Sequence, residues 1–122
     1  MKELLIVDDS STIRKAISMI LKPFGFNQHE AENGKIALEF CQNTMPDIVI
    51  VDWNMPVMTG IEFLELVRKL ENGHKPKIVL CTTNAELEHI QEALEKGADE
   101  YIIKPFTKEM IEEKLSMVGA FE

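Results

Sequence analysis

Short apolar runs alternate five times with segments whose hydrophobic residues recur at helical spacing, and this alternation narrows the possible folds. Four of the runs, at 3–7, 47–51, 77–81 and 99–103, are rich in Val, Ile and Leu. Such runs are typical of strands that are buried on both faces of a parallel sheet. Parallel strands joined by helices need right-handed crossovers, so the sequence predicts an α/β fold with a doubly wound sheet.

The remaining run, at 27–31, differs because it contains Asn27, Gln28, His29 and Glu30. In a central strand these polar side chains would be buried against apolar helices, so the pattern predicts an edge strand. An edge position for the second strand favours the order 2-1-3-4-5. The expected architecture is a flavodoxin-like (βα)5 three-layer sandwich with five parallel strands.

Capping residues, glycine and proline mark where the helices are expected to begin and end. Thr59 and Glu62 have the spacing of a capping box, so a helix is expected to begin after Thr59. Asn84 is a candidate N-cap for a helix that continues to about Lys96, and Gly97 suits the left-handed position that follows. Other helix boundaries are expected at Pro23 to Gly25, Asn33, Met45-Pro46 and Thr107.

Length and hydropathy exclude several classes of protein. The 122 residues predict one domain, at 1–122, without an effector domain. Uninterrupted apolar stretches do not exceed five residues, whereas a membrane span needs about twenty, so membrane insertion is not expected. The chain also has no basic start followed by a longer apolar run, which predicts a cytoplasmic protein.

Charge and the scattered Cys and His residues add further expectations. The formal net charge of −8 disfavours binding to nucleic acid. Between residues 86 and 114 there are nine acidic and four basic residues, which fits either a solvated face or a surface for a basic partner. Cys41 and Cys81 are expected to be buried or half-buried thiols, and His89, in a helical segment, is expected to have a surface role.

Reactive residues stand at the carboxyl ends of four predicted strands. Asp8 and Asp9 follow the first strand, Asp52 the third, Thr82 the fourth and Lys104 the fifth. In an open parallel sheet these ends meet at one edge, where the strand order reverses, so the side chains are expected to converge. Paired aspartates can instead cap a helix and a lysine can be a surface charge, but the common position of all five favours a site.

The residue types at these strand ends suit phosphoryl transfer. Three close carboxylates raise one another's pKa, and a hard cation relieves their repulsion. Oxygen ligands suit Mg²⁺ or Mn²⁺ and argue against zinc. With a metal and Lys104 neutralising phosphoryl oxygens, Asp52 can attack in line and the Thr82 hydroxyl can donate to the phosphoryl group.

With these residues in place, the chain resembles the response-regulator receiver domains, and most closely the single-domain chemotaxis proteins of the CheY type. The resemblance covers residues 3 to about 118 through LLIVDDS, PDIVIVDWNMPVMTG, VLCT, GADEYIIKPF and EEKL, in family order and spacing. It implies that Asp52 accepts a phosphoryl group from a histidine kinase or a histidine phosphotransfer domain. It also implies that Mg²⁺ is bound by Asp8, Asp9, Asp52 and the backbone carbonyl of Asn54.

The same resemblance implies a conformational switch. Lys104, joined to Pro105 by a cis peptide bond, would pair with Asp52 or its phosphoryl group. When the Thr82 hydroxyl moves to that group, the Tyr101 ring can turn inward into the vacated space. The surface formed by the fourth helix, fifth strand and fifth helix would then change its partners.

Some positions depart from the family pattern or vary within the family. Thr59 replaces a usual Asp and keeps the helix cap without its charge. Thr83 replaces a usual Ala or Gly, so its β-branched side chain can crowd the phosphoryl pocket or add a hydrogen bond. Asn54 and Asn84 flank the pocket at positions that influence autodephosphorylation in the family. The lifetime of a phosphoryl group does not follow from these residues.

The expected output partner is a separate protein, such as a flagellar motor switch protein, a phosphotransfer protein or another kinase. Lys114 resembles a position on the motor-binding face of CheY proteins, but the sequence does not choose among these partners. The expected state is a monomer, with dimerisation on phosphorylation left open. A second alternative that stays open is that the chain is a fragment of a larger regulator.

Three other functions compete with the switch. An aspartyl-phosphate phosphatase is disfavoured because Asn54 stands where haloacid-dehalogenase-type enzymes have their acid, and no cap domain fits the length. Flavin binding is disfavoured because Asp8 and Asp9 would repel the flavin phosphate. A phosphorylation-independent scaffold with a receiver-like fold is the third alternative, although such scaffolds normally lose a pocket residue and none is missing here.

Overall fold

The computed structural model describes residues 1–122 and contains one five-stranded sheet in the order β2-β1-β3-β4-β5. All four neighbouring pairs of strands are parallel. The predicted strand order and the (βα)5 architecture are therefore confirmed. The strands are β1 (Glu3–Val7), β2 (Asn27–Ala31), β3 (Ile48–Asp52), β4 (Lys77–Thr82) and β5 (Glu100–Ile103).

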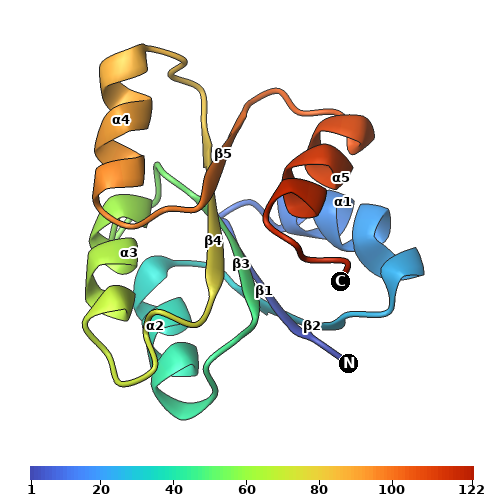
Figure 1. The fold of residues 1–122 in the computed structure, drawn as a ribbon, viewed down its shortest axis with the longest axis horizontal. Helices are drawn as coiled ribbons and strands as arrows, with labels where there is room; N and C mark the ends of the chain where they lie inside the picture. Colours follow the sequence, from blue (N-terminus) through green and yellow to red (C-terminus); the bar gives the residue numbers. More distant parts are fainter.

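Five helices cover the two faces of the sheet, with α2, α3 and α4 on one side and α1 and α5 on the other (Figure 1). No helix has the length and apolar character that crossing a membrane requires. The five helices are α1 (Ser11–Leu21), α2 (Gly34–Asn43), α3 (Gly60–Arg68), α4 (Leu87–Glu95) and α5 (Lys108–Met117). A short 3-10 turn, η1 (Lys22–Phe24), follows α1.

Two hydrophobic cores lie on opposite faces of the sheet because successive side chains of a strand point to opposite sides. Leu5 and Val7 belong to the core beneath α2, α3 and α4, whereas Leu4 and Ile6 belong to the core beneath α1 and α5. All four are almost completely buried. Burial of one such side chain stabilises the fold by about 1.5–3 kcal/mol, so the apolar runs hold the strand ends in fixed positions.

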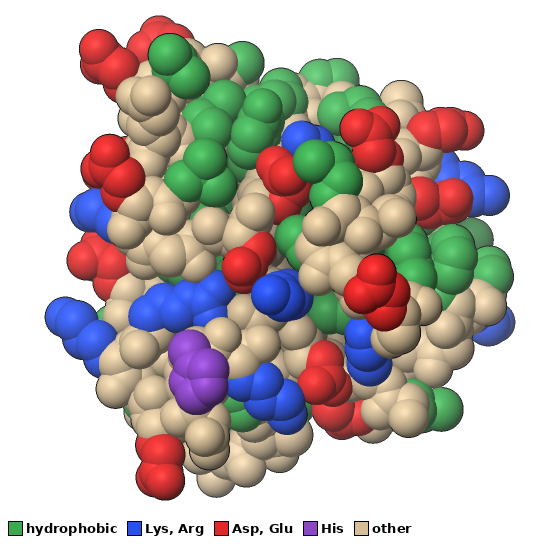
Figure 2. Space-filling model, viewed as in Figure 1, with side chains coloured by type: hydrophobic (Ala, Val, Ile, Leu, Met, Phe, Trp, Pro, Cys, Tyr) green, Lys and Arg blue, Asp and Glu red, His purple; other side chains and the backbone are tan.

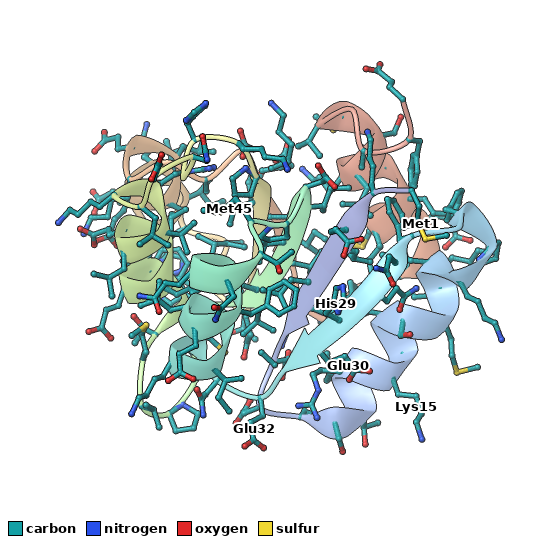
Figure 3. The ribbon with its side chains drawn as sticks, turned by 90° about the horizontal axis from the view of Figure 1, so that it is seen from below. Met1, Lys15, His29, Glu30, Glu32 and Met45 are labelled. Atoms are coloured by element: carbon teal, nitrogen blue, oxygen red, sulfur yellow. The ribbon has the colours of Figure 1, made fainter.

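The edge strand β2 confirms the prediction made from its polarity. Its Asn27 and Glu30 are exposed, and His29 Nε2 donates to Glu3 Oε1 of β1 over 2.9 Å. Glu30 pairs with Arg14 of α1 over 2.9 Å. Figure 3 shows His29 and Glu30 on this outer strand beside α1. The His29 ring also lies against Phe40 of α2, with ring centroids 4.7 Å apart. The polar atoms of this strand thus meet solvent or polar partners on β1 and α1.

The capping box at the start of α3 is present as predicted. The Glu62 amide donates to Thr59 Oγ1 over 3.2 Å, and the Thr59 amide donates to Glu62 Oε1 over 3.0 Å. Gly97, after α4, has a φ of 113°, which is in the region that favours glycine. Cys41 and Cys81 are both buried free thiols, as expected.

The predicted start of α4 at Asn84 is wrong. The helix begins at Leu87, after Glu86, and the Asn84 side chain instead accepts a hydrogen bond from the Glu86 amide over 2.9 Å. The Asn84 amide donates to the Thr82 hydroxyl over 3.1 Å. These two bonds hold residues 82–86 in a turn, so the chain crosses the edge of the sheet before it becomes helical.

Strand ends also differ by one residue from the apolar runs. β3 extends to Asp52 and β4 extends to Thr82, so both reactive residues are the last members of their strands. Asp52 pairs in register with Cys81, and Thr82 pairs with Ile103. Backbone hydrogen bonding therefore fixes these two side chains more rigidly than loop positions would.

Candidate functional site at the carboxyl ends of the strands

Asp8, Asp52 and Thr82 are the only polar residues in the structure that are buried as completely as the core. Their exposed fractions are 3%, 7% and 2%. Burial of a charged or polar group costs free energy unless partners compensate. Three such groups at one end of the sheet therefore mark this end as the candidate site.

The carboxylates of Asp8, Asp9 and Asp52 converge as predicted. Each offers an oxygen, and these oxygens all lie within 4.8 Å of one another. Lys104 extends from the end of β5, and its Nζ lies 3.0 Å from Asp8 Oδ2 and 3.0 Å from Asp52 Oδ1. Three carboxylates minus one ammonium leave a formal charge of −2. One lysine thus bridges two carboxylates without neutralising the cluster.

The pKa values of this cluster reflect that imbalance. Burial raises the pKa of Asp52 above its ordinary value; Lys104 lowers it by hydrogen bonding and charge, but the charges of Asp8 and Asp9 raise it again. Burial by itself lowers the pKa of Lys104, but hydrogen bonds to Asp52 and Asp8 outweigh burial, so the net pKa is raised. The ammonium is therefore held charged, while the Asp52 carboxylate lacks full compensation.

Local backbone contacts orient Asp8. Its Oδ1 accepts the Ser10 amide over 2.9 Å, and its carbonyl oxygen accepts Arg14 Nη1 over 2.6 Å. The N-cap of α1 is Ser10, whose Oγ accepts the Ile13 amide over 3.2 Å. Helix capping does not explain the paired aspartates, because Ser10 performs that role. Asp9, which is exposed, faces the cluster from its solvent side.

The loop after β3 approaches the Asp52 backbone closely. A Cβ on Gly60 would lie 2.4 Å from the Asp52 carbonyl oxygen, so only glycine fits. The Gly60 amide donates to the Trp53 carbonyl over 2.8 Å, and the Trp53 amide donates to the Cys81 carbonyl over 2.8 Å. This loop carries Asn54, whose side chain is exposed. The peptide between Lys104 and Pro105 is cis.

Thr82 is engaged on the side of α4. Its Oγ1 lies 3.0 Å from His89 Nε2 and accepts the Asn84 amide over 3.1 Å. The His89 ring also stacks on Trp53, with ring centroids 3.6 Å apart and planes at 25°. His89 is half-buried, so the expectation of a simple surface role is wrong. The signal available in the sequence was its position in the first turn of the helix that follows Thr82.

Tyr101 lies on the edge strand β5, in register with Leu80, two residues before Thr82 on the neighbouring strand. The Lys114 ammonium lies 4.3 Å from the centre of its ring. Lys114 also pairs with Glu100 over 3.1 Å. A cation above an aromatic face is attracted by the ring. The half-buried Tyr101 ring is therefore held toward α5 by a charged neighbour.

Thr83 and Asn84 are exposed at the rim of the site. Thr83 borders a surface pocket of about 350 Å³ together with Lys104 and Pro105; Ile13, Ala16 and Phe106 complete its lining. The predicted residues thus form two groups. Asp8, Asp9, Asp52 and Lys104 lie together, whereas Thr82 and Tyr101 are held by other partners.

Comparison with known proteins agrees with this fold. The family model for the response regulator receiver domain matches residues 4–116. The chemotaxis protein CheY of Pseudomonas aeruginosa is 38% identical over 117 residues, which cover 95% of this chain and 94% of that protein. The chain belongs to the response regulator receiver domain family.

Solved structures give the same assignment of fold. The chemotaxis protein CheY4 of Vibrio cholerae superposes with a TM-score of 0.90 at 37% identity, covering 97% of this chain and 98% of that one. The receiver domain of a Pseudomonas aeruginosa sensor histidine kinase superposes with a TM-score of 0.84 at 25% identity, covering 97% and 98%. That structure has a magnesium ion coordinated in its active-site cleft.

Proposed function

We propose that this chain is a stand-alone response regulator that accepts a phosphoryl group on Asp52 from a phosphohistidine. One observation carries the proposal: the buried Asp52 carboxylate is adjacent to two further carboxylates and lies 3.0 Å from the Lys104 ammonium. The donor would be a histidine kinase or a histidine phosphotransfer domain. An Asp52 oxygen attacks phosphorus, the bond from phosphorus to the imidazole nitrogen breaks, and the imidazole leaves as the acyl phosphate forms.

The donor set of the site fits a hard divalent cation. Carboxylate oxygens of Asp8, Asp9 and Asp52 would bind Mg²⁺, or Mn²⁺, with the backbone carbonyl of Asn54 as a further ligand. When bound, such an ion neutralises charge that develops on the phosphoryl oxygens. The formal charge of −2 favours a cation at this end of the sheet. The magnesium-containing receiver domain supports the same assignment.

Lys104 and Thr82 would act on the phosphoryl group once it is attached. The Lys104 ammonium, now shared between Asp8 and Asp52, turns to a phosphoryl oxygen. The Thr82 hydroxyl donates to another oxygen, and the Tyr101 ring turns into the space that Thr82 leaves. Asn54, Thr83 and Asn84 stand around the pocket and would modulate attack by water on the acyl phosphate.

The output surface would be the face formed by α4, β5 and α5. Figure 2 shows hydrophobic side chains gathered between α4 and α5 at the top of the view, with acidic side chains along the outer edge of α4. Leu87 and Leu94 of α4 are 69% and 44% exposed. An exposed apolar patch with a charged border is the kind of surface that binds a protein partner.

The names of the relatives favour a role in chemotaxis. In such a role, the output partner would be a flagellar motor switch protein. The aligned residues cover 94% of the related CheY. We propose that residues 1–122 form one receiver domain and that it acts in the cytoplasm as a monomer. We propose no nucleic-acid partner, because the net charge is −8. Its only chemistry would be self-catalysed phosphotransfer and autodephosphorylation, so it is a signalling switch and not an enzyme with a separate substrate.

Incubation with acetyl phosphate and Mg²⁺, followed by intact mass measurement, tests the proposal. We expect the mass of one phosphoryl group to be added to the parent chain and no addition to Asp52→Asn. Glu39→Gln, which changes an exposed carboxylate on α2, is the matched control and should be labelled like the parent. A parent chain that stays unlabelled would instead favour the phosphorylation-independent scaffold.

A further inference from the structure

His89 is in contact with both the buried Thr82 hydroxyl and the tryptophan that follows Asp52. We infer that His89 is a positioning residue that restrains the Thr82 hydroxyl in the unphosphorylated chain and connects its movement to the start of α4. The inference rests on the proposed function, because the restraint has a role only if Thr82 moves toward a phosphoryl group on Asp52.

The hydrogen bonds of Thr82 leave little freedom for its hydroxyl. A threonine hydroxyl has one proton to donate and two lone pairs to accept with. The Asn84 amide must donate to Oγ1, which it does over 3.1 Å. His89 Nε2, 3.0 Å away, either accepts the hydroxyl proton or donates its own proton to the remaining lone pair. Both arrangements hold Oγ1 toward α4, and the first one also occupies the proton that a phosphoryl oxygen would need.

The His89 ring is itself held in place. It stacks on Trp53 with centroids 3.6 Å apart, and the Trp53 backbone is fixed to β4 by the 2.8 Å bond to the Cys81 carbonyl. The His89 backbone belongs to the first turn of α4. The ring therefore joins three elements: the end of β4 through Thr82, the loop after β3 through Trp53, and α4.

Movement of Thr82 has a structural cost that follows from these contacts. If the hydroxyl turns to a phosphoryl group on Asp52, His89 either loses its hydrogen-bond partner or moves with it. Movement of the ring would disturb the stack on Trp53 and displace the first turn of α4. Phosphorylation at the strand ends is thereby coupled to the proposed output surface by a side chain of this helix, in addition to any movement of Tyr101.

Two substitutions separate the hydrogen bond from the stack. His89→Phe keeps an aromatic ring against Trp53 but cannot bond to Thr82, whereas His89→Gln keeps a hydrogen-bonding side chain without the ring. Beryllofluoride with Mg²⁺, as a noncovalent phosphoryl analogue, is titrated into each chain and followed by Trp53 fluorescence. Since one neutral hydrogen bond shifts an equilibrium by about two- to tenfold, the midpoint should fall by that factor in His89→Phe. It should stay within about twofold of the parent in His89→Gln. His74→Phe, which alters an exposed histidine, is the control and should not change the midpoint.

A second measurement follows the parent chain, with Thr82→Val as the reference for a lost hydrogen bond. Long-range ¹H–¹⁵N spectra report the Nε2 resonance of His89, which should shift when beryllofluoride saturates the site and should shift similarly in Thr82→Val without it. A purely structural role would leave this resonance unchanged on saturation.

The outcomes distinguish the two proposals. If acetyl phosphate labels Asp52 but the Nε2 resonance and the midpoints stay unchanged, the restraint is overturned and the proposed function stands. If the parent chain takes up neither acetyl phosphate label nor beryllofluoride, both the proposed function and the restraint fail.

Discussion

Aspartates stand at both ends of the same sheet, but their carboxylates are used differently. At the amino ends, Asp47 Oδ2 accepts the Glu3 amide over 2.7 Å, and Asp99 Oδ2 accepts the Ile78 amide over 2.8 Å and pairs with Arg68 over 2.9 Å. At the carboxyl ends, the three carboxylates of Asp8, Asp9 and Asp52 share one ammonium. The aspartates at the amino ends have hydrogen-bond or ion-pair partners within the chain, so they stabilise the fold. The crowded aspartates at the carboxyl ends lack such compensation and can bind a further ligand.

The largest expected effect is on metal binding, which should depend on the aspartates at the carboxyl ends and not on those at the amino ends. Trp53 directly follows Asp52, so its fluorescence should change when Mg²⁺ is added at millimolar levels. Asp9→Asn should abolish the response because it removes a proposed ligand. Asp99→Asn, at the other end, should respond like the parent. An unchanged signal in all three chains would contradict the metal site.

Stability should show the opposite pattern. Asp99→Ala leaves the buried Ile78 amide without an acceptor and removes the one carboxylate among the hydrogen-bond acceptors of Arg68. The free energy of unfolding should therefore fall by about 2 kcal/mol, measured by urea denaturation. Asp9→Asn should not lower it, since Asp9 is exposed and its charge repels two neighbours. Equal losses in the two variants would remove the distinction between the ends.

The loops at the two ends of the sheet each contain one non-glycine residue with a positive φ. Val57, at the carboxyl end, has a φ of 72°, and Asn72, at the amino end, has a φ of 63°. Asn tolerates this left-handed region, whereas a β-branched residue is strained in it. Val57→Asn should raise the free energy of unfolding by about 1 kcal/mol, and Asn72→Val should lower it by about the same amount. Thermal unfolding of both variants measures the difference, and a loss in Val57→Asn would contradict the strain.

The smallest expected effect is a trend with pH. Because the pKa of Asp52 is raised in the folded chain, the folded state holds this proton more tightly than the unfolded state does. Its contribution to stability is present at low pH and is lost as pH rises through the raised folded pKa. The stability of Asp52→Asn relative to the parent should therefore increase as pH rises from about 4 toward neutrality. Denaturation at several pH values without divalent cations tests the trend, and the reverse slope would contradict it.

Prediction from the sequence succeeded where the signal is local or set by strand polarity. The apolar runs identified the strands, the polar Asn27–Ala31 run identified the edge strand, and the spacing of Thr59 and Glu62 identified the start of α3. It failed at Asn84, because an asparagine suits both a helix N-cap and a turn. The competing bond from the Asn84 amide to Thr82 depends on where β4 ends.

The candidate site was predicted to a similar depth. The convergence of Asp8, Asp9, Asp52 and Lys104 followed from strand order, because parallel strands bring their carboxyl ends to one edge. The contact between His89 and Thr82 did not follow, since the facing of a helical side chain depends on how α4 docks. Hydrophobic periodicity in the sequence does not determine the orientation in which α4 packs against the sheet.

The sequence by itself determined which segments are strands and helices, the order of the strands, and which reactive residues meet at one edge. The strands and helices follow from hydrophobic periodicity, which each segment carries by itself. The strand order and the shared edge follow from the polarity of the 27–31 run and from the geometry of parallel sheets. Only the tertiary structure decided that Lys104 bridges Asp8 and Asp52, that His89 contacts the Thr82 hydroxyl, and that Lys114 lies above Tyr101. Such pairings depend on side-chain packing between distant segments, where shifts of a few ångströms decide whether a hydrogen bond forms.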